Sequence, residues 1–294
     1  MPAGGQWVGA VPGWNDGDAA GKPSSLTLPG RLCTVHESVF LCPQSKHFMN
    51  FTDCIPPSAS SLREEGLERI AFFGRSLADY EAIFGVSRTA LRGRRVLDVG
   101  GGTASFTAEA TLAGIDATAV DPIYRFRLPA VRDRALRDFS AVQAMVQTHG
   151  SRYTMGSYGA EEPLWAKRLQ TQKCFLDDFP AGFACGRYRG GGLPLLEFEN
   201  RSFDLVLCSH LLFLYGSCLS WDFHQSALRE LARVAREKVL IYPLLTLSGQ
   251  PYARLDELRR NLATAGIESA LEPVHHSVMS GADQRLVLFT CNQS

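Results

Sequence analysis

A short apolar run that ends in three glycines constrains the fold more than any other feature of this chain of 294 residues. Residues 94–99 read as a buried strand, Gly100, Gly101 and Gly102 follow at once, and a helical pattern begins at Ala104. Glycine is needed where the backbone bends sharply and where a ligand approaches without a Cβ in the way. The free N–H groups at the start of the helix favour a polar or anionic ligand. The motif therefore predicts a ligand-binding turn between a strand and a helix.

Strand and helix patterns alternate along the rest of the chain. We expect further strands at residues 117–120, 203–208, 239–243, 269–275 and 285–290, and helices at residues 76–84, 104–112, 221–236 and 255–265. Such alternation predicts a parallel sheet with helices on both faces. The loop around residues 280–283 is too short for a helical crossover, so the last two strands should pair antiparallel.

Three regions are expected along the chain. Residues 1–30 are rich in Gly and Pro and predict a disordered tail. Residues 31–90 form an N-terminal extension and a helical cap, in which a capping box at residues 61–64 predicts a helix reaching residue 73. Residues 91–294 form the α/β domain, with an insertion at about 123–187 that we interpret as a lid over the ligand site.

Composition excludes several classes of protein. Lys and Arg number 30 and Asp and Glu number 30, so the chain lacks the positive excess of a bulk nucleic-acid binder or of a polybasic membrane-surface protein. No uninterrupted apolar stretch of about 20 residues predicts a transmembrane helix, and no signal peptide is recognisable. The eight cysteines form no CxxC pair and no usual zinc spacing, so we expect no metal site and a cytoplasmic protein with reduced thiols.

An acidic residue follows the second strand at the position that a nucleoside site requires. Asp121 lies 21 residues after Gly100, where its carboxylate can accept hydrogen bonds from ribose hydroxyls. A dinucleotide site would favour glycine or alanine where Ser105 stands and an apolar residue where Asp98 stands. Both residues weaken the prediction of a nicotinamide cofactor.

An acidic residue two positions before the first glycine resembles motif I of the class I S-adenosylmethionine-dependent methyltransferases, acidic-x-Gly-x-Gly-x-Gly, with Ala104 in place of the third glycine. Leu193-Pro194 followed by residues 202–207 looks like the segment that leads into the fourth strand of that family. Residues 230–234 and 239–241 look like its helix and fifth strand. The resemblance covers residues 93–291 apart from the insertion.

The resemblance implies a Rossmann-like sheet of seven strands, mostly parallel with an antiparallel final strand, helices on both faces and an N-terminal helical cap. It implies S-adenosyl-L-methionine as the cofactor and is silent on the acceptor. We expect an unidentified, small-molecule acceptor, with no nucleic-acid or membrane partner. The residues that it assigns to cofactor binding are Asp98, Gly100, Gly101, Gly102, Asp121, Pro122, Gly192, Leu193 and Ser209.

Two histidines are candidates for a general base. His210 follows the fourth strand at the edge where open α/β sheets bind ligands, and His224 is the second candidate. Either side chain could instead be a hydrogen-bonded packing residue. The arginines between residues 125 and 137 are a solvated helix face or, alternatively, an anion-recognising wall over the pocket. Two other functions stay open, a non-catalytic nucleoside-binding relative and an NAD(P)-dependent oxidoreductase.

Overall fold

A computed structural model describes residues 69–155 and 158–290 of the chain. The predicted tail at residues 1–30, the capping box at residues 61–64 and most of the N-terminal extension lie outside the described residues. The second predicted helix of the cap lies within them. It is α2 (Leu77–Phe84), which begins after the N-cap Ser76 and ends at Gly85 in the left-handed conformation, φ 55°.

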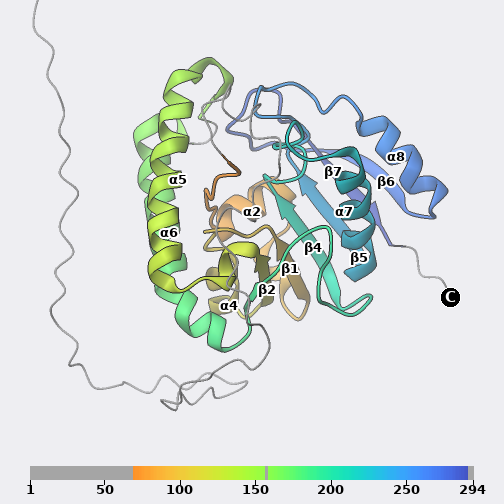
Figure 1. The fold of residues 1–294 in the computed structure, drawn as a ribbon, viewed down its shortest axis with the longest axis horizontal. Coiled ribbons are helices and arrows are strands. Elements are labelled where there is room, and N and C mark those ends of the chain that lie inside the picture. Colours follow the sequence, from red (N-terminus) through yellow and green to blue (C-terminus); the bar gives the residue numbers. More distant parts are fainter. Residues whose placement is uncertain (1–68, 156–157, 291–294) are drawn as a thin grey trace, which may run out of the picture. The chain divides into compact units, whose positions relative to one another are not determined.

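Seven strands form one sheet (Figure 1). They are β1 (Arg95–Val99), β2 (Asp116–Asp121), β3 (Tyr188–Gly190), β4 (Phe203–Ser209), β5 (Ala235–Tyr242), β6 (Glu268–Pro273) and β7 (Gln284–Phe289). Their order across the sheet is β3-β2-β1-β4-β5-β7-β6. Pairing is parallel from β3 to β5, and β7 runs antiparallel to both β5 and β6. The predicted fold class is confirmed.

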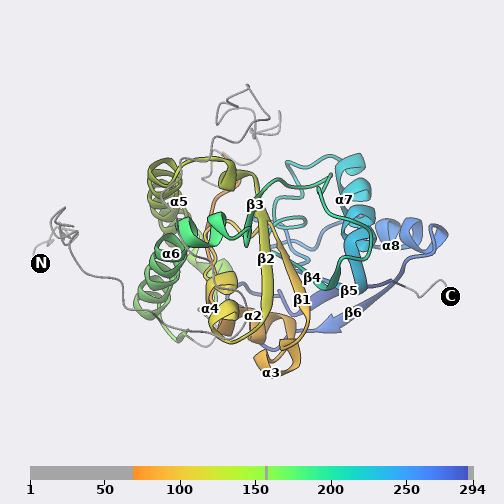
Figure 2. The same ribbon diagram turned by 90° about the horizontal axis from the view of Figure 1, so that it is seen from below.

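Helices cover both faces of the sheet (Figure 2). One face carries α2, α4 (Phe106–Leu112), α5 (Leu128–Thr148) and α6 (Glu161–Ala184), and the other carries α7 (Trp221–Val234) and α8 (Leu255–Thr264). The short α3 (Arg88–Leu91) precedes β1, and two 3-10 turns, η2 (Pro122–Arg125) and η3 (Gly150–Arg152), flank α5. Among the described residues, no helix has both the length and the apolar character needed to cross a membrane.

The two faces of the sheet bury separate cores because successive strand residues point in opposite directions. Val96 of β1 packs in one cluster with Phe84 and Phe106, from α2 and α4. Its neighbour Leu97 packs in the other cluster with Leu231 of α7. This alternation holds β1 at the centre of the sheet, so the glycine turn that follows it has a fixed position.

Three sequence predictions needed correction or completion. Residues 70–73, predicted as the end of a helix, are extended, because their backbone groups bond to side chains of distant elements. The strand β3 lies in a glycine-dense stretch where no strand pattern was recognised. The insertion is helical throughout most of its length, and α5 and α6 pack side by side (Figure 1).

Candidate functional site

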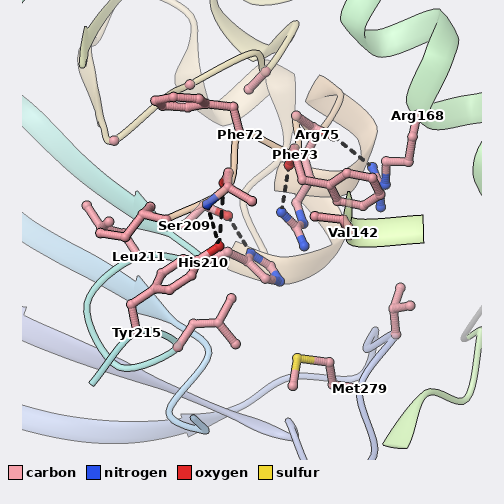
Figure 3. Close-up of a pocket in the computed structure, with 18 of the residues that line it drawn as sticks. Phe72, Phe73, Arg75, Val142, Arg168, Ser209, His210, Leu211, Tyr215 and Met279 are labelled. Carbon is pink, nitrogen blue, oxygen red and sulfur yellow. Dashed lines mark hydrogen bonds between the residues drawn. The ribbon is translucent and has the colours of Figure 1, made fainter. Parts of the chain in front are cut away.

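The strand order reverses between β1 and β4, and ligands of open α/β sheets bind at the carboxyl edge of such a point. The glycine turn follows β1, and His210 follows β4, so the two motifs flank this crevice. A cavity of about 110 Å³ opens here, with room for roughly eight water molecules (Figure 3). Its lining combines Gly100, Gly101, Gly102, Asp121, Ser209 and His210 with apolar residues from α5, α6 and several loops.

The glycine turn has the backbone that its sequence predicts. Gly100 and Gly102 have φ angles of 74° and 51°, in the left-handed region that favours glycine. A Cβ on Gly100 would lie 2.6 Å from Cδ2 of Leu211, and a Cβ on Gly102 would lie 2.9 Å from Cδ1 of Phe72. Any larger residue would therefore collide with the side chains that face the turn.

Asp121 is buried beneath the turn and braces it. Its Oδ2 accepts a hydrogen bond from the Gly102 N–H at 3.0 Å, and its Oδ1 accepts one from the Ile123 N–H at 2.9 Å. Burial raises the pKa of this carboxyl to about 6. The carboxylate thus has a structural role in the turn and also lines the cavity, where each oxygen keeps a second lone pair.

Asp98 lies under the turn from the other side. Its Oδ1 accepts a hydrogen bond from the Tyr80 hydroxyl at 2.9 Å, while its buried Oδ2 has no partner among the described residues. Burial raises the pKa of Asp98 to about 7, and the nearby charge of Asp121 acts in the same direction. A buried carboxylate with an unpartnered oxygen favours a cationic or hydrogen-bond-donating group nearby.

His210 faces the cavity from the end of β4. Its backbone is in the left-handed region, φ 53°, and its N–H donates to the Tyr242 carbonyl at 2.6 Å. The ring Nδ1 lies 2.9 Å from the Ser209 hydroxyl oxygen. Burial, with the charges of Arg75 and Arg168, holds the pKa of His210 well below its usual value. The imidazole is therefore neutral at pH 7.

His224, the second candidate base, is packed inside the protein. Its side chain is fully buried, and its two ring nitrogens lie 2.8 Å from the Ser220 carbonyl and 3.1 Å from the Leu212 carbonyl. It does not line the cavity. The structure gives this histidine a packing role, because both ring nitrogens already face backbone acceptors.

Four predicted cofactor residues lie outside the cavity lining: Asp98, which is buried beneath the turn, and Pro122, Gly192 and Leu193. Pro122 follows Asp121 directly, and a Cβ on Gly192 would lie 3.1 Å from Cγ of Pro122. The Gly191 N–H donates to the Asp121 carbonyl at 3.3 Å, so this glycine-rich segment borders Asp121. Leu193 continues the same segment and packs against the core on the α7 side. A role for Pro122, Gly192 and Leu193 in adenine binding stays a prediction.

An extended segment before α2 forms a wall that sequence reasoning missed. We define it as the strap, residues 70–75. The Ala71 N–H donates to the Tyr215 hydroxyl at 3.1 Å, and the Phe72 N–H donates to Oδ2 of Asp138 in α5 at 2.9 Å. These partners lie 144 and 66 residues away in the chain. No local sequence pattern reports bonds of that range.

The insertion lies beside the strap and adds to the lining, at the position that the lid interpretation expects. Val142 and Met145 of α5 and Trp165 of α6 line the cavity, and Figure 3 shows Val142 near Phe73 of the strap. The predicted arginine wall does not form: of residues 125–137, none lines the cavity, and Arg134 instead pairs with Asp138 at 2.8 Å. The arginines that reach the cavity are Arg75 of the strap and Arg168 of α6.

Metal binding has no support in the part of the chain that the structure describes. Across residues 69–155 and 158–290, no group of three or more His, Cys, Asp or Glu side chains is arranged to hold a metal ion.

Comparisons with known proteins return methyltransferases as structural neighbours. No protein-family model matches the sequence. An uncharacterized protein of Methanocaldococcus jannaschii is 24% identical over 228 residues, which span 77% of this chain and 99% of that protein.

Two solved structures illustrate the neighbours. Magnesium protoporphyrin IX methyltransferase from Synechocystis PCC 6803, with bound S-adenosylmethionine, is 15% identical over 73% of this chain and 78% of its own, with a TM-score of 0.39. A Burkholderia thailandensis 1,6-didemethyltoxoflavin N1-methyltransferase is 16% identical over 79% and 77%, with a TM-score of 0.36. The strand order, the antiparallel β7 and the glycine turn after β1 establish the fold independently of these values. The chain has the fold of the class I S-adenosylmethionine-dependent methyltransferases.

Proposed function

We propose that this protein is an S-adenosylmethionine-dependent methyltransferase that acts on a small-molecule acceptor. The observation that carries the proposal is the glycine turn, which is braced by Asp121 and opens into a cavity at the switch point of the sheet. The cavity, with a volume of about 110 Å³ and mostly apolar walls, supports an acceptor group of small-molecule size.

The residues around the turn fit the cofactor in charge and in shape. The unpartnered Oδ2 of Asp98 is suited to the ammonium group of a methionine, directly or through a water. The absence of side chains at Gly100 and Gly102 leaves room for a ligand to approach the backbone of the turn, whose Gly100 and Gly102 N–H groups are already bonded to the Val120 carbonyl and to Asp121. Phe72 and Leu211 now contact this turn, so cofactor binding requires these two side chains to move aside.

The bound cofactor supplies a methyl group that is already activated as a sulfonium. The work left to the chain is to align the acceptor and to exclude water, and alignment can lower the barrier by roughly 7–11 kcal/mol in ideal cases. The strap, α5 and α6 line the cavity with apolar side chains, which offer water few hydrogen-bond partners beside a bound acceptor. A lining of this kind also strengthens the electrostatic interactions inside.

His210 is the candidate general base. Because its pKa is low, the ring is neutral at pH 7 and keeps a lone pair, and the same low pKa makes it a weak base. When Nδ1 donates its proton to the Ser209 hydroxyl, Nε2 carries the lone pair. An acceptor atom that carries no proton at neutral pH needs no such base, and His210 then only positions the acceptor.

Titration calorimetry with S-adenosylhomocysteine, NAD and NADP tests the proposal. We expect S-adenosylhomocysteine to bind, and at a hundred times its dissociation constant to stabilise the protein by about 2.7 kcal/mol. Asp121→Ala should weaken this binding by one to two decades, because the loss of charge-assisted hydrogen bonds costs about 1.5–3 kcal/mol.

The control variant is Asp116→Ala, which removes an exposed carboxylate from the opposite end of β2. It should bind S-adenosylhomocysteine as the parent protein does. Binding of NAD or NADP without binding of S-adenosylhomocysteine would overturn the proposal in favour of an oxidoreductase. Binding of S-adenosylhomocysteine with no methyl transfer to any acceptor in a broad library would identify a non-catalytic relative.

A further inference from the structure

The cavity contains one charged group that the proposed chemistry does not use, the guanidinium of Arg75. Arg75 ends the strap, and Figure 3 shows its guanidinium beside the ring of His210. It donates one hydrogen bond, from Nη1 to the Phe73 carbonyl at 3.1 Å. Among the described residues, no carboxylate lies within 4 Å of it to form an ion pair.

The second arginine of this wall is fully committed to a carboxylate. Nη1 of Arg168 lies 2.7 Å from Oδ2 of Asp79, and both side chains are only 3% exposed. Asp79 also accepts hydrogen bonds from the Tyr158 hydroxyl and from the Ser76 N–H. This wall therefore holds two guanidinium groups and one carboxylate. The carboxylate pairs with Arg168, so Arg75 has no carboxylate partner.

An enclosed cation without a partner is unfavourable, and an anionic ligand removes that cost. Burial and the like charge of Arg168 lower the pKa of Arg75 to about 10, which leaves the guanidinium protonated at pH 7. A single planar guanidinium matches a carboxylate through two parallel N–H bonds. The single charge of a carboxylate balances the one guanidinium that has no carboxylate partner, since Arg168 is paired with Asp79.

The position of Arg75 places it beside the candidate base. Figure 3 shows its guanidinium next to the ring of His210, which follows β4, and the two groups interact electrostatically. Arg75 also interacts with Tyr80, whose hydroxyl donates to Asp98. Arg75 therefore belongs to the side of the cavity where the candidate base lies. The remaining lining on that side is apolar, with Val142, Trp165 and Met279 among its residues (Figure 3).

We propose that Arg75 binds a carboxylate of the methyl acceptor, and that the acceptor is a small apolar organic acid whose hydrocarbon or aromatic part fills the pocket between the strap, α5 and α6. The identity of this ligand as the acceptor rests on the proposed function. The cofactor also has a carboxylate, on its methionine part, so the test must distinguish the two sources.

Calorimetry with 3-phenylpropionate and its neutral amide, each with and without saturating S-adenosylhomocysteine, tests this assignment. The acid should bind at least about tenfold more tightly than the amide, because a charge-assisted bidentate pair replaces a neutral contact. Arg75→Gln should abolish that preference, and Arg75→Lys should keep part of it. The matched control, Arg94→Gln, removes an exposed arginine that pairs with Glu237, and it should keep the full preference.

Each other outcome has a definite meaning. Equal binding of acid and amide, while S-adenosylhomocysteine binds normally, would overturn the carboxylate assignment and leave the proposed function intact. An equal loss of S-adenosylhomocysteine affinity in Arg75→Gln would overturn it too, because Arg75 would then hold the carboxylate of the cofactor. Arg75-dependent binding of the acid by a protein that does not bind S-adenosylhomocysteine would support the carboxylate site and refute the methyltransferase proposal.

Discussion

The two sides of the cavity differ in the sign of their buried charge and in how their residues come together. The side beneath the glycine turn is acidic, with Asp98 in β1 and Asp121 as the last residue of the neighbouring strand β2. The strap side is basic, with Arg75 and Arg168 separated by more than ninety residues of chain. The acidic side is a local motif, whereas the basic side exists only after α6 has packed against α2. A sequence can therefore reveal the acidic side, whose residues follow one local pattern, but not the basic side.

The largest expected effect comes from breaking the ion pair of the basic side. Asp79→Ala leaves the Arg168 guanidinium buried without its carboxylate, which should lower the free energy of unfolding by about 3–5 kcal/mol. Urea unfolding at pH 7 measures this loss. The control is Asp177→Ala, which breaks the exposed Lys173–Asp177 pair on α6, the helix that carries Arg168. This variant should lower the free energy of unfolding by less than about 1 kcal/mol. If both variants lost the same free energy of unfolding, the burial of the Arg168–Asp79 pair could not explain its importance.

Sequence reasoning identified the acidic side well. The glycine turn, Asp121 and His210 line the cavity and Asp98 lies beneath the turn, because a strand that ends in glycines and an acid at the end of the neighbouring strand meet at one edge of a parallel sheet. The fold followed from the same alternation of strands and helices. The antiparallel pairing of β6 and β7 could be predicted because their connection is too short to cross over.

The basic side could not be identified from the sequence. The arginine-rich run at residues 125–137 suggested an anion site by its composition, yet its members do not line the cavity. Arg75 lies in a stretch without a recognisable period, and the strap gains its shape from Tyr215 and Asp138 far along the chain. His224 shows the converse error, since a polar residue beside a buried stripe can satisfy its nitrogens inside the core.

The second prediction concerns the pH dependence of the free energy of unfolding and tests the acidic side through Asp98. In the folded protein the pKa of Asp98 is raised from 3.8 to about 7, so ionisation disfavours folding. The stability that this group contributes is full below about pH 4 and is lost as the pH rises through 7. The loss amounts to at most about 4 kcal/mol, since one pKa unit corresponds to about 1.4 kcal/mol.

Asp98→Asn should remove this fall, because the amide keeps the acceptor for the Tyr80 hydroxyl and never ionises. Urea unfolding of both proteins between pH 4 and pH 8 measures the effect, which should appear as a stabilisation that grows with pH. Asp116→Asn, which changes an exposed carboxylate, provides the baseline. A constant difference between Asp98→Asn and the parent across this range would show that Asp98 does not titrate there.

The smallest expected effect completes the comparison between the two arginines. Arg75→Gln removes an enclosed charge that has no carboxylate partner, so the free energy of unfolding should stay within about 1 kcal/mol of the parent value or rise. Arg168→Gln, by contrast, leaves the Asp79 carboxylate buried without its arginine and should destabilise the protein strongly.

Parallel urea titrations with and without 3-phenylpropionate link this result to binding, because a ligand stabilises only a protein that binds it. The parent should gain stability with the acid, and Arg75→Gln should not. A loss of more than about 2 kcal/mol in Arg75→Gln without ligand would mean that this arginine supports the fold, and the basic side would then carry no charge reserved for a ligand.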